Sequence, residues 1–396
     1  MKFLLVRNIL FSTLILILAG CQSGRDSSAP ERTGPQPGEG PIISKPLPAQ
    51  AQSDLPGGQM TTKVALLLPL SGHQEKLGTA MLNAAQMSLF ENAPDQIELV
   101  SEDTHGTPEG AAHAAEKVIR EGARLIVGPI FSPEVTAVAR VASQHQLPVL
   151  TFSNNQAVAQ PNVFLLGFML DQQIHRLFSV AQEKGITRIS MIVPKSEAGT
   201  ILLGQAEMAA HAAGVQLVPV EAYAPGTTDM KAQAASIRKS GVQAVLIPEG
   251  GQQLRLMISS LLSNSVDPNK VKFLGTGQWD SPDVYGDRSL NGSWFAASPI
   301  SLRQNFMKKY AATYGQQPPR LATLAYDTIS MVSLLMRNQG PDQAFVLQNM
   351  VQPRGYSGID GVFRLNANGT VDRGLAVYEI SDKQGLSVVS AAPEGF

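Results

Sequence analysis

A short unit repeats along this chain: a helical segment, then a glycine, then an apolar run of three to five residues. The copies are Gly122 before 125–127, Gly185 before 189–193, Gly214 before 215–218 and Gly241 before 244–247. Glycine takes the left-handed conformation that ends a helix without a steric penalty. Strands that alternate with helices imply right-handed crossovers and parallel sheets covered by helices on both faces. The repeat therefore predicts a doubly wound α/β fold.

The length of the alternating region indicates two lobes, because it runs for about 280 residues, more than one hydrophobic core usually supports. We expect two doubly wound parallel-sheet lobes joined by a hinge. The expected division is 61–168 with 293–340 for lobe one, and 169–292 with 341–396 for lobe two. A late hairpin is expected around Asn368 and Gly369, because both residues accept positive φ.

Two helix starts can be located from capping residues. Thr107, Pro108 and Glu109 combine a cap, a proline at the first helical position and an early acid, which predicts a helix that ends at Gly122. Asp171 precedes another segment with one apolar face, and we expect its carboxylate to cap that helix.

Composition argues against several classes of function. The 31 Lys and Arg residues balance 32 Asp and Glu residues, so no excess of positive charge favours nucleic acid. The chain has one cysteine, and its six histidines lack the spacing that places two metal ligands on one helix face. The sequence also lacks the motifs of serine hydrolases, phosphate-binding loops and zinc enzymes. We expect no metal, no cofactor and no catalysis.

The amino-terminal region has the features of an exported, lipid-modified protein. Lys2 and Arg7 precede an apolar stretch of about ten residues, half the length of a membrane-spanning helix, which is typical of a signal peptide. Residues 18–21, Leu-Ala-Gly-Cys, resemble the lipobox of bacterial lipoproteins. The resemblance implies cleavage after residue 20 and anchoring through acyl chains on Cys21. Gln22, which follows in place of Asp, implies export to the outer membrane.

Residues 21–60 after the signal peptide are dominated by Ser, Pro, Gly, Gln and Ala. This composition buries too little apolar surface to order itself, so we expect a disordered tether. As a coil its ends lie about 35 Å apart, so the folded body can reach away from the membrane. A passive spacer and a binding segment are both open interpretations of the tether.

Several stretches resemble the first lobe of type 1 periplasmic-binding proteins, in the branched-chain amino acid receptor group. They are 102–104, 111–122, 127–132 and 147–153, and 324–327 looks like the returning helix of that group. The resemblance implies a bilobed, hinged body. The residues 195–197, Lys-Ser-Glu, stand where this group typically has an aromatic with a glycine, which argues against a free amino acid as ligand.

One lipoprotein branch of that group, the penicillin-binding protein activators, resembles this chain more specifically. The segment 275–280, Gly-Thr-Gly-Gln-Trp-Asp, carries this resemblance together with the lipobox and the hairpin region 358–374. It implies a non-catalytic outer-membrane lipoprotein that activates a peptidoglycan synthase by direct contact. The best-known activators carry a helical-repeat domain before this body, where the present sequence has the tether.

A second hypothesis is a periplasmic receptor that delivers an amino acid or a similar small polar ligand to an ABC transporter. A cleft that senses a wall fragment would combine the two roles. The contacts of a bound ligand are expected at the carboxyl ends of the strands, where open parallel sheets bind ligands.

In lobe one, Ser132 could cap a helix or hold a carboxylate. The next loop supplies the candidates Ser153, Asn154 and Asn155. Their side chains could equally form the hydrogen bonds of their own turn.

Lobe two supplies three further candidates. Glu249 follows the run 244–247 and could neutralise a substrate ammonium. Trp279 could stack on a ligand or fill the closed cleft, and Asp280 could accept a hydrogen bond.

Overall fold

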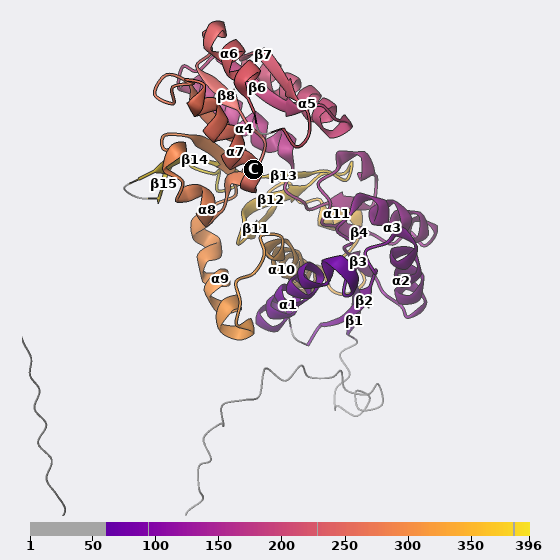
Figure 1. The fold of residues 1–396 in the computed structure, drawn as a ribbon. Helices are drawn as coiled ribbons and strands as arrows, with labels where there is room; N and C mark the ends of the chain where they lie inside the picture. The colour runs from indigo at the N-terminus through magenta and orange to yellow at the C-terminus, as the bar shows by residue number, and fades with distance from the viewer. Residues whose placement is uncertain (1–60, 94, 228, 383–384) are drawn as a thin grey trace, which may run out of the picture. The chain divides into compact units, whose positions relative to one another are not determined.

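The computed structural model describes residues 61–93, 95–227, 229–382 and 385–396. Two sheets of mainly parallel strands form two lobes in this part of the chain, each with helices on both faces (Figure 1). The predicted signal peptide, lipid attachment at Cys21 and tether lie outside the described residues. None of the helices in the described ranges combines the length and the hydropathy of a membrane span.

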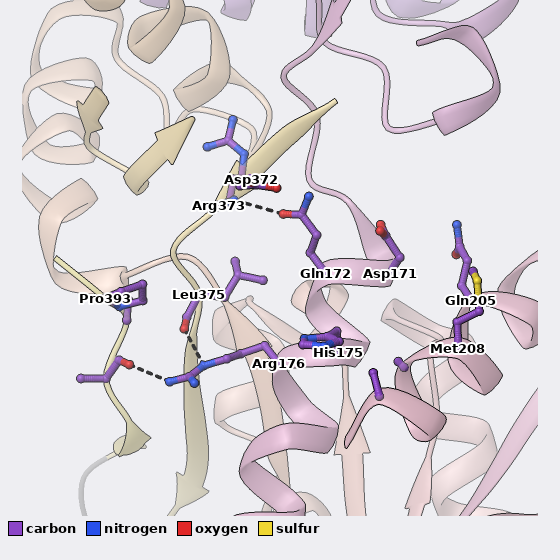
Figure 2. A pocket seen from close by; sticks show the side chains of 14 residues that line it. Asp171, Gln172, His175, Arg176, Gln205, Met208, Asp372, Arg373, Leu375 and Pro393 are labelled. Carbon is purple, nitrogen blue, oxygen red and sulfur yellow. Dashed lines mark hydrogen bonds between the residues drawn. The ribbon is translucent and has the colours of Figure 1, made fainter. Parts of the chain in front are cut away.

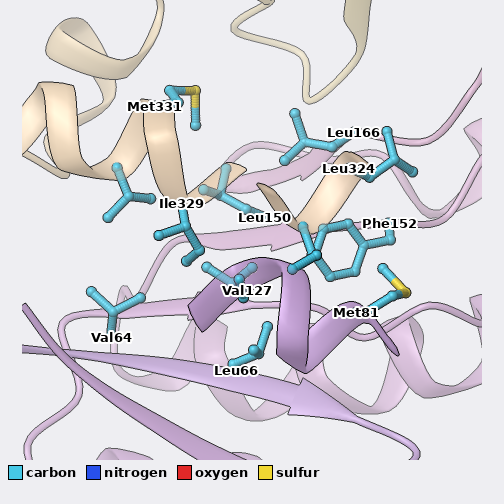
Figure 3. Packing of buried hydrophobic residues seen from close by; sticks show 14 of the residues in the cluster. Val64, Leu66, Met81, Val127, Leu150, Phe152, Leu166, Leu324, Ile329 and Met331 are labelled. Carbon is cyan, nitrogen blue, oxygen red and sulfur yellow. The ribbon is translucent and has the colours of Figure 1, made fainter. Parts of the chain in front are cut away.

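The sheet of lobe one has five parallel strands in the order β2-β1-β3-β4-β5. They are β1 (Thr62–Leu68), β2 (Ile97–Asp103), β3 (Leu125–Val127), β4 (Val149–Thr151) and β5 (Val163–Leu165). One face is covered by α1 (Glu75–Asn92) and α10 (Ala322–Gln339), and the other by α2 (Pro108–Arg120) and α3 (Ser132–Gln144). Figure 3 shows Met81 and Ile329 packed on Leu66 and Val127. Strand β1 is buried on both faces, which explains its continuous apolar run.

The sheet of lobe two has seven strands in the order β15-β14-β10-β9-β8-β6-β7. The parallel strands are β6 (Arg188–Pro194), β7 (Gln216–Tyr223), β8 (Ala244–Leu246), β9 (Lys272–Gly275) and β10 (Trp294–Ala297). The antiparallel edge is β14 (Ala376–Ser381) and β15 (Gly385–Ser390). Its covering helices are α4 (Leu170–Glu183) and α5 (Glu197–Ala213) on one face, and α6 (Lys231–Ser240) and α7 (Gly251–Ser263) on the other. The parallel strands repeat the order of lobe one.

A smaller antiparallel sheet completes lobe one. Its strands are β11 (Tyr356–Gly358), β12 (Gly361–Leu365) and β13 (Val371–Arg373). Tyr356, Phe363 and Leu365 lie in the lobe-one core, as do Phe306 of α9 (Ile300–Tyr314) and Met350 of α11 (Leu347–Met350). The remaining short elements are α8 (Pro282–Tyr285) and the turns η2 (Gly72–Gln74), η3 (Gln156–Val158), η4 (Gly277–Trp279) and η5 (Arg288–Leu290).

The predicted α/β class with two parallel-sheet lobes is confirmed. The four repeating glycines all have positive φ, between 65° and 90°. Thr107 caps α2, because its Oγ1 accepts a hydrogen bond from the N–H of Gly110 at 3.0 Å. The late hairpin is the pair β12 and β13. The capping role of Asp171 is wrong: α4 begins one residue earlier, and the carboxylate accepts from Gln156 Nε2 at 2.7 Å.

The lobe assignment needs correction in two segments. We predicted that 293–340 return to lobe one, but β10 pairs with β9 and β14, because its apolar run extends the second sheet by one strand. We assigned 341–396 to lobe two, but β11 to β13 bury their side chains in the lobe-one core. The chain therefore passes between the lobes at 166–169, 298–299 and 374–375, which we call the crossings.

Candidate functional site

At the strand ends of lobe one, the predicted polar side chains serve the loop itself. Ser132 is the first residue of α3, and its Oγ lies 3.1 Å from the Oγ of Ser153. The N-cap of α3 is Phe131, so the predicted capping role of Ser132 is wrong. Ser153 is 3% exposed and also accepts from the N–H of Asn155 at 3.2 Å. Asn155 in turn accepts from the N–H of Ala157 at 3.0 Å and caps η3.

At the strand ends of lobe two, Glu249 and Trp279 form part of the packing. Tyr223 donates its hydroxyl proton to Glu249, and burial together with this carboxylate raises the pKa of the tyrosine. Trp279 is 0% exposed and donates from Nε1 to the backbone oxygen of Glu249 at 2.9 Å. A Cβ on Gly275 would lie 2.0 Å from the indole ring, so only glycine allows this packing. Trp279 belongs to the lobe-two core and presents no stacking face.

Asp280 ties lobe two to lobe one. Its side chain is 1% exposed, and its Oδ1 accepts from Arg303 of α9 and from the hydroxyl of Tyr285. Its Oδ2 lies 3.4 Å from Nε of Arg320, which precedes α10. Burial and the Asp280 carboxylate raise the pKa of Tyr285. Asp280 is therefore paired with two arginines, but its Oδ2 makes no hydrogen bond among the described residues.

A buried charge network continues from Arg320 into lobe one. Arg320 donates to both oxygens of Asp360, at 3.0 and 2.8 Å. Burial opposes ionisation of Asp360, but the Arg320 guanidinium outweighs it and lowers the pKa of that carboxyl. Asp327 accepts from the N–H groups of Ile359 and Asp360 at 2.7 and 3.1 Å. Burial and the Asp360 charge raise the pKa of Asp327 to about 7.

A cavity of about 370 Å³ lies beside this network, between the lobes. Its apolar lining comes from Phe168, Met169, Leu170, Ala297 and Leu375, which lie at or next to the crossings. Its polar side chains are Asn154, Gln172, Gln173, Gln278, Asp280, Ser281, Ser298, Arg320 and Arg373. A cavity of this size suits a small solute. Of the seven residues predicted from the sequence, Asn154 and Asp280 line it, and the other five do not.

Two arginines flank the ring of Phe168 at this cavity. Their Cζ atoms lie 4.1 Å (Arg320) and 5.2 Å (Arg373) from the ring centroid, within the range of cation–π contacts. The Arg320 side chain is 28% exposed, whereas Arg373 is 8% exposed and donates from Nη2 to the backbone oxygen of Leu166 at 2.6 Å. Within the described part of the chain, three lining residues have buried polar atoms without a hydrogen-bond partner: Nε and Nη1 of Arg373, Oγ of Ser298 and Oδ2 of Asp280.

Sequence reasoning missed most of this cavity because its residues come from segments far apart in the chain. Arg373 did carry a signal: in β13 it shares a face with Val371, which places an arginine on the buried side of a strand. Arg320 follows two prolines ahead of a helix, where no pattern marks it.

A second cavity, of about 670 Å³, is lined by α4, α5, β13 and the segment 391–393 (Figure 2). Arg176 points to the backbone there and donates to the oxygens of Leu375 at 3.0 Å and Ala391 at 2.8 Å. Gln172 accepts from the N–H of Arg373 at 3.1 Å. These bonds join α4 to the third crossing, so the polar groups of this cavity hold the lobes together. Across the described ranges, no three His, Cys, Asp or Glu side chains gather as metal ligands.

Comparison with known proteins identifies the family that this fold and cavity define. A periplasmic binding protein family model matches residues 61–385, and the chain belongs to that family. The Leu/Ile/Val-binding protein BraC3 of Rhizobium johnstonii is 26% identical over 203 residues, which is 48% of this chain and 55% of BraC3. The chain spans about half the length of the Leu/Ile/Val-binding relatives that it matches, and 32% of a further relative from Rickettsia prowazekii.

Solved structures show the same fold. The leucine-binding protein LivK of Thermotoga maritima has a TM-score of 0.61 and 20% identity, and the match covers 84% of this chain and 98% of LivK. A solute-binding protein of an ABC transporter from Rhodopseudomonas palustris, in complex with 3,4-dihydroxybenzoic acid, has a TM-score of 0.63 and 18% identity. That match covers 85% of this chain and 97% of the other.

Proposed function

We propose that this chain is a receptor that binds a small polar solute in the cavity at the crossings. The observation that carries the proposal is a cavity of about 370 Å³ to which both lobes contribute, Asn154 and Arg320 from lobe one and Gln278 from lobe two. A ligand that contacts both lobes stabilises their closed arrangement, which a partner can then detect. The relatives are named as Leu/Ile/Val-binding and ABC transporter solute-binding proteins, which supports delivery to such a transporter and no catalytic role.

Calorimetric titration of the purified protein with amino acids and small organic acids tests this proposal. We expect saturable binding with a micromolar Kd, about −8 kcal/mol. Asn154→Trp adds a large side chain at an exposed position of the lining and should abolish binding of any solute. The neighbouring Asn155→Trp, outside the lining, is the matched control. A panel without any binding, or an equal loss in both variants, would count against the receptor.

We also propose that Cys21 carries the acyl chains that hold the mature protein at the outer membrane, on its periplasmic side. The lipobox sequence 18–21 supports this placement. Cys21→Ser should move the protein from the membrane fraction to the soluble fraction of the periplasm. Retention of the variant in the outer-membrane fraction would contradict lipid attachment at this residue.

Activation of a peptidoglycan synthase, a penicillin-binding protein, is the second candidate function. It is favoured by the lipobox together with the segment 275–280, and the relatives described above lend it no support. Crosslinking in intact cells, followed by identification of the attached protein, separates the two candidates. Recovery of a synthase would favour the activator, and recovery of a permease would favour the receptor.

A further inference from the structure

We infer that the ligand of this cavity is a carboxylate that has an apolar body and no ammonium group. The inference rests on the proposed receptor function and names the substrate class of the same site. Three observations carry it: the charges that line the cavity, the pairing of the one lining carboxylate with two arginines, and the apolar surface beside both.

The charged lining favours an anion. It consists of two arginines, Arg320 and Arg373, and one carboxylate, Asp280. Arg320 is already paired with Asp360, so Arg373 is the lining charge without an ion pair among the described residues. Arg320 remains 28% exposed, and two nitrogens of Arg373 lack an acceptor among the described residues. The Oγ of Ser298, also in the lining, lacks a partner as well. Guanidinium groups match the geometry of carboxylates, and buried donors without an acceptor are costly.

The one carboxylate of the described lining is already paired with two arginines. That carboxylate is Asp280: its Oδ1 accepts from Arg303 and Tyr285, and its Oδ2, which makes no hydrogen bond among the described residues, lies 3.4 Å from Nε of Arg320. Glu249 lies outside the lining and accepts from Tyr223. Asp171 lines the larger cavity of Figure 2 instead. An ammonium group brought here would lose its water and meet two arginines, which disfavours a free amino acid.

The rest of the lining suits an apolar body. Phe168, Met169, Leu170, Ala297 and Leu375 supply aromatic and aliphatic surface next to the arginines. Burying that surface against an apolar group of the ligand removes it from water and so stabilises the complex. The arrangement places a charged end and an apolar end within one cavity of about 370 Å³.

Two series of matched compounds test the inference by calorimetry. The first is 4-methylpentanoate, L-leucine and 3-methylbutylamine, which share a branched chain and differ in their charged groups. The second is 3-phenylpropanoate, L-phenylalanine and 2-phenylethylamine. In at least one series we expect the acid to bind at least tenfold more tightly than the amino acid, and the amine not to bind. An amino acid within tenfold of its acid in both series, or tighter, overturns the inference, as does binding of an amine.

The same titrations separate the inference from the receptor function. Binding of an amino acid or amine without binding of either acid defeats the inference and leaves the receptor standing. If none of the six compounds binds, the result contradicts both the inference and the receptor function. Inorganic phosphate is titrated alone, and if it binds more tightly than both acids, the assignment to a carboxylate is wrong.

A pair of neighbouring substitutions tests the charge directly. Asn154 is exposed and lines the cavity, whereas Asn155 does not line it. Asn154→Asp should weaken binding of the acid at least tenfold, because it adds a negative charge to the lining. Asn155→Asp should change the affinity less than threefold, since an aspartate oxygen can still accept from the N–H of Ala157. Equal affinity of the two variants for the acid overturns the inference.

Discussion

The loops at the strand ends and the crossings both carry polar side chains, but they use them differently. At the strand ends, Ser132 bonds with Ser153, and Glu249 bonds with Tyr223. At the crossings, Arg373 and Ser298 keep buried polar atoms without a partner in the described part of the chain. Buried polar groups in folded proteins are normally paired. The comparison teaches that unpaired polar atoms lie at the crossings, which supports our proposal that a ligand binds there, while the strand-end residues stabilise their own loops.

The largest effect is expected where the crossings depend on buried charge. Asp360→Ala removes the carboxylate that pairs with Arg320 and leaves a guanidinium without its partner. The free energy of unfolding should fall by about 3–5 kcal/mol. Asp372→Ala, which breaks a half-buried pair with Arg364, should cost less than about 1 kcal/mol. Urea denaturation measures the free energy of unfolding of both variants. Equal decreases would show that the buried charge network does not stabilise the crossings.

A pH dependence should accompany the same network. The pKa of Asp327 is about 7 in the folded protein and near 4 in an unfolded chain. The folded state binds this proton more tightly, so its contribution is fully present below pH 4 and is lost as the pH rises to 7. Each unit of difference corresponds to about 1.4 kcal/mol. Asp327→Asn should flatten the unfolding free energy between pH 4 and 7, and an unchanged slope would contradict the assignment.

At the strand ends of lobe two, the expected effect is on packing. Gly275→Ala would drive a methyl group into the ring of Trp279 and should lower the free energy of unfolding by about 1–3 kcal/mol. Gly204→Ala, at an open position within α5, should instead raise it by about 0.5–1 kcal/mol. Thermal denaturation distinguishes the two signs. A neutral Gly275→Ala would mean that Trp279 is free to move.

The smallest effect is expected for Ser153→Ala. It removes the hydrogen bonds with Ser132 and with the N–H of Asn155, and should cost about 1–2 kcal/mol of stability. Its effect on the affinity for 4-methylpentanoate should stay below twofold, because Ser153 does not line the cavity. If calorimetry showed a tenfold loss of affinity for 4-methylpentanoate, the strand-end residues would be the ones that bind the ligand.

Local patterns predicted the fold well. The repeating glycines and the cap at Thr107 act through neighbouring residues, and both are confirmed. The path of the chain between the lobes was predicted less well, because an apolar strand such as Trp294–Ala297 fits the sheet of either lobe. Its pairing with β9 decides the assignment, and pairing is a property of the tertiary structure.

Only those residues of the cavity that follow a strand were predicted from the sequence. Asn154 and Asp280 follow strands and were found by that rule. Phe168, Ser298 and Leu375 meet because three separate crossings lie together, which no local pattern encodes. Conversely, Trp279 follows a strand but is buried by its contact with Gly275. The rule that ligands sit at strand ends locates the region and does not identify the contacts.

A crystal structure of the protein with 4-methylpentanoate tests the central claim most directly. We predict the carboxylate within hydrogen-bond distance of Arg320 or Arg373, with the branched chain against Phe168. A carboxylate held by Ser132 and Ser153 instead, with both arginines in their present contacts, would contradict the account.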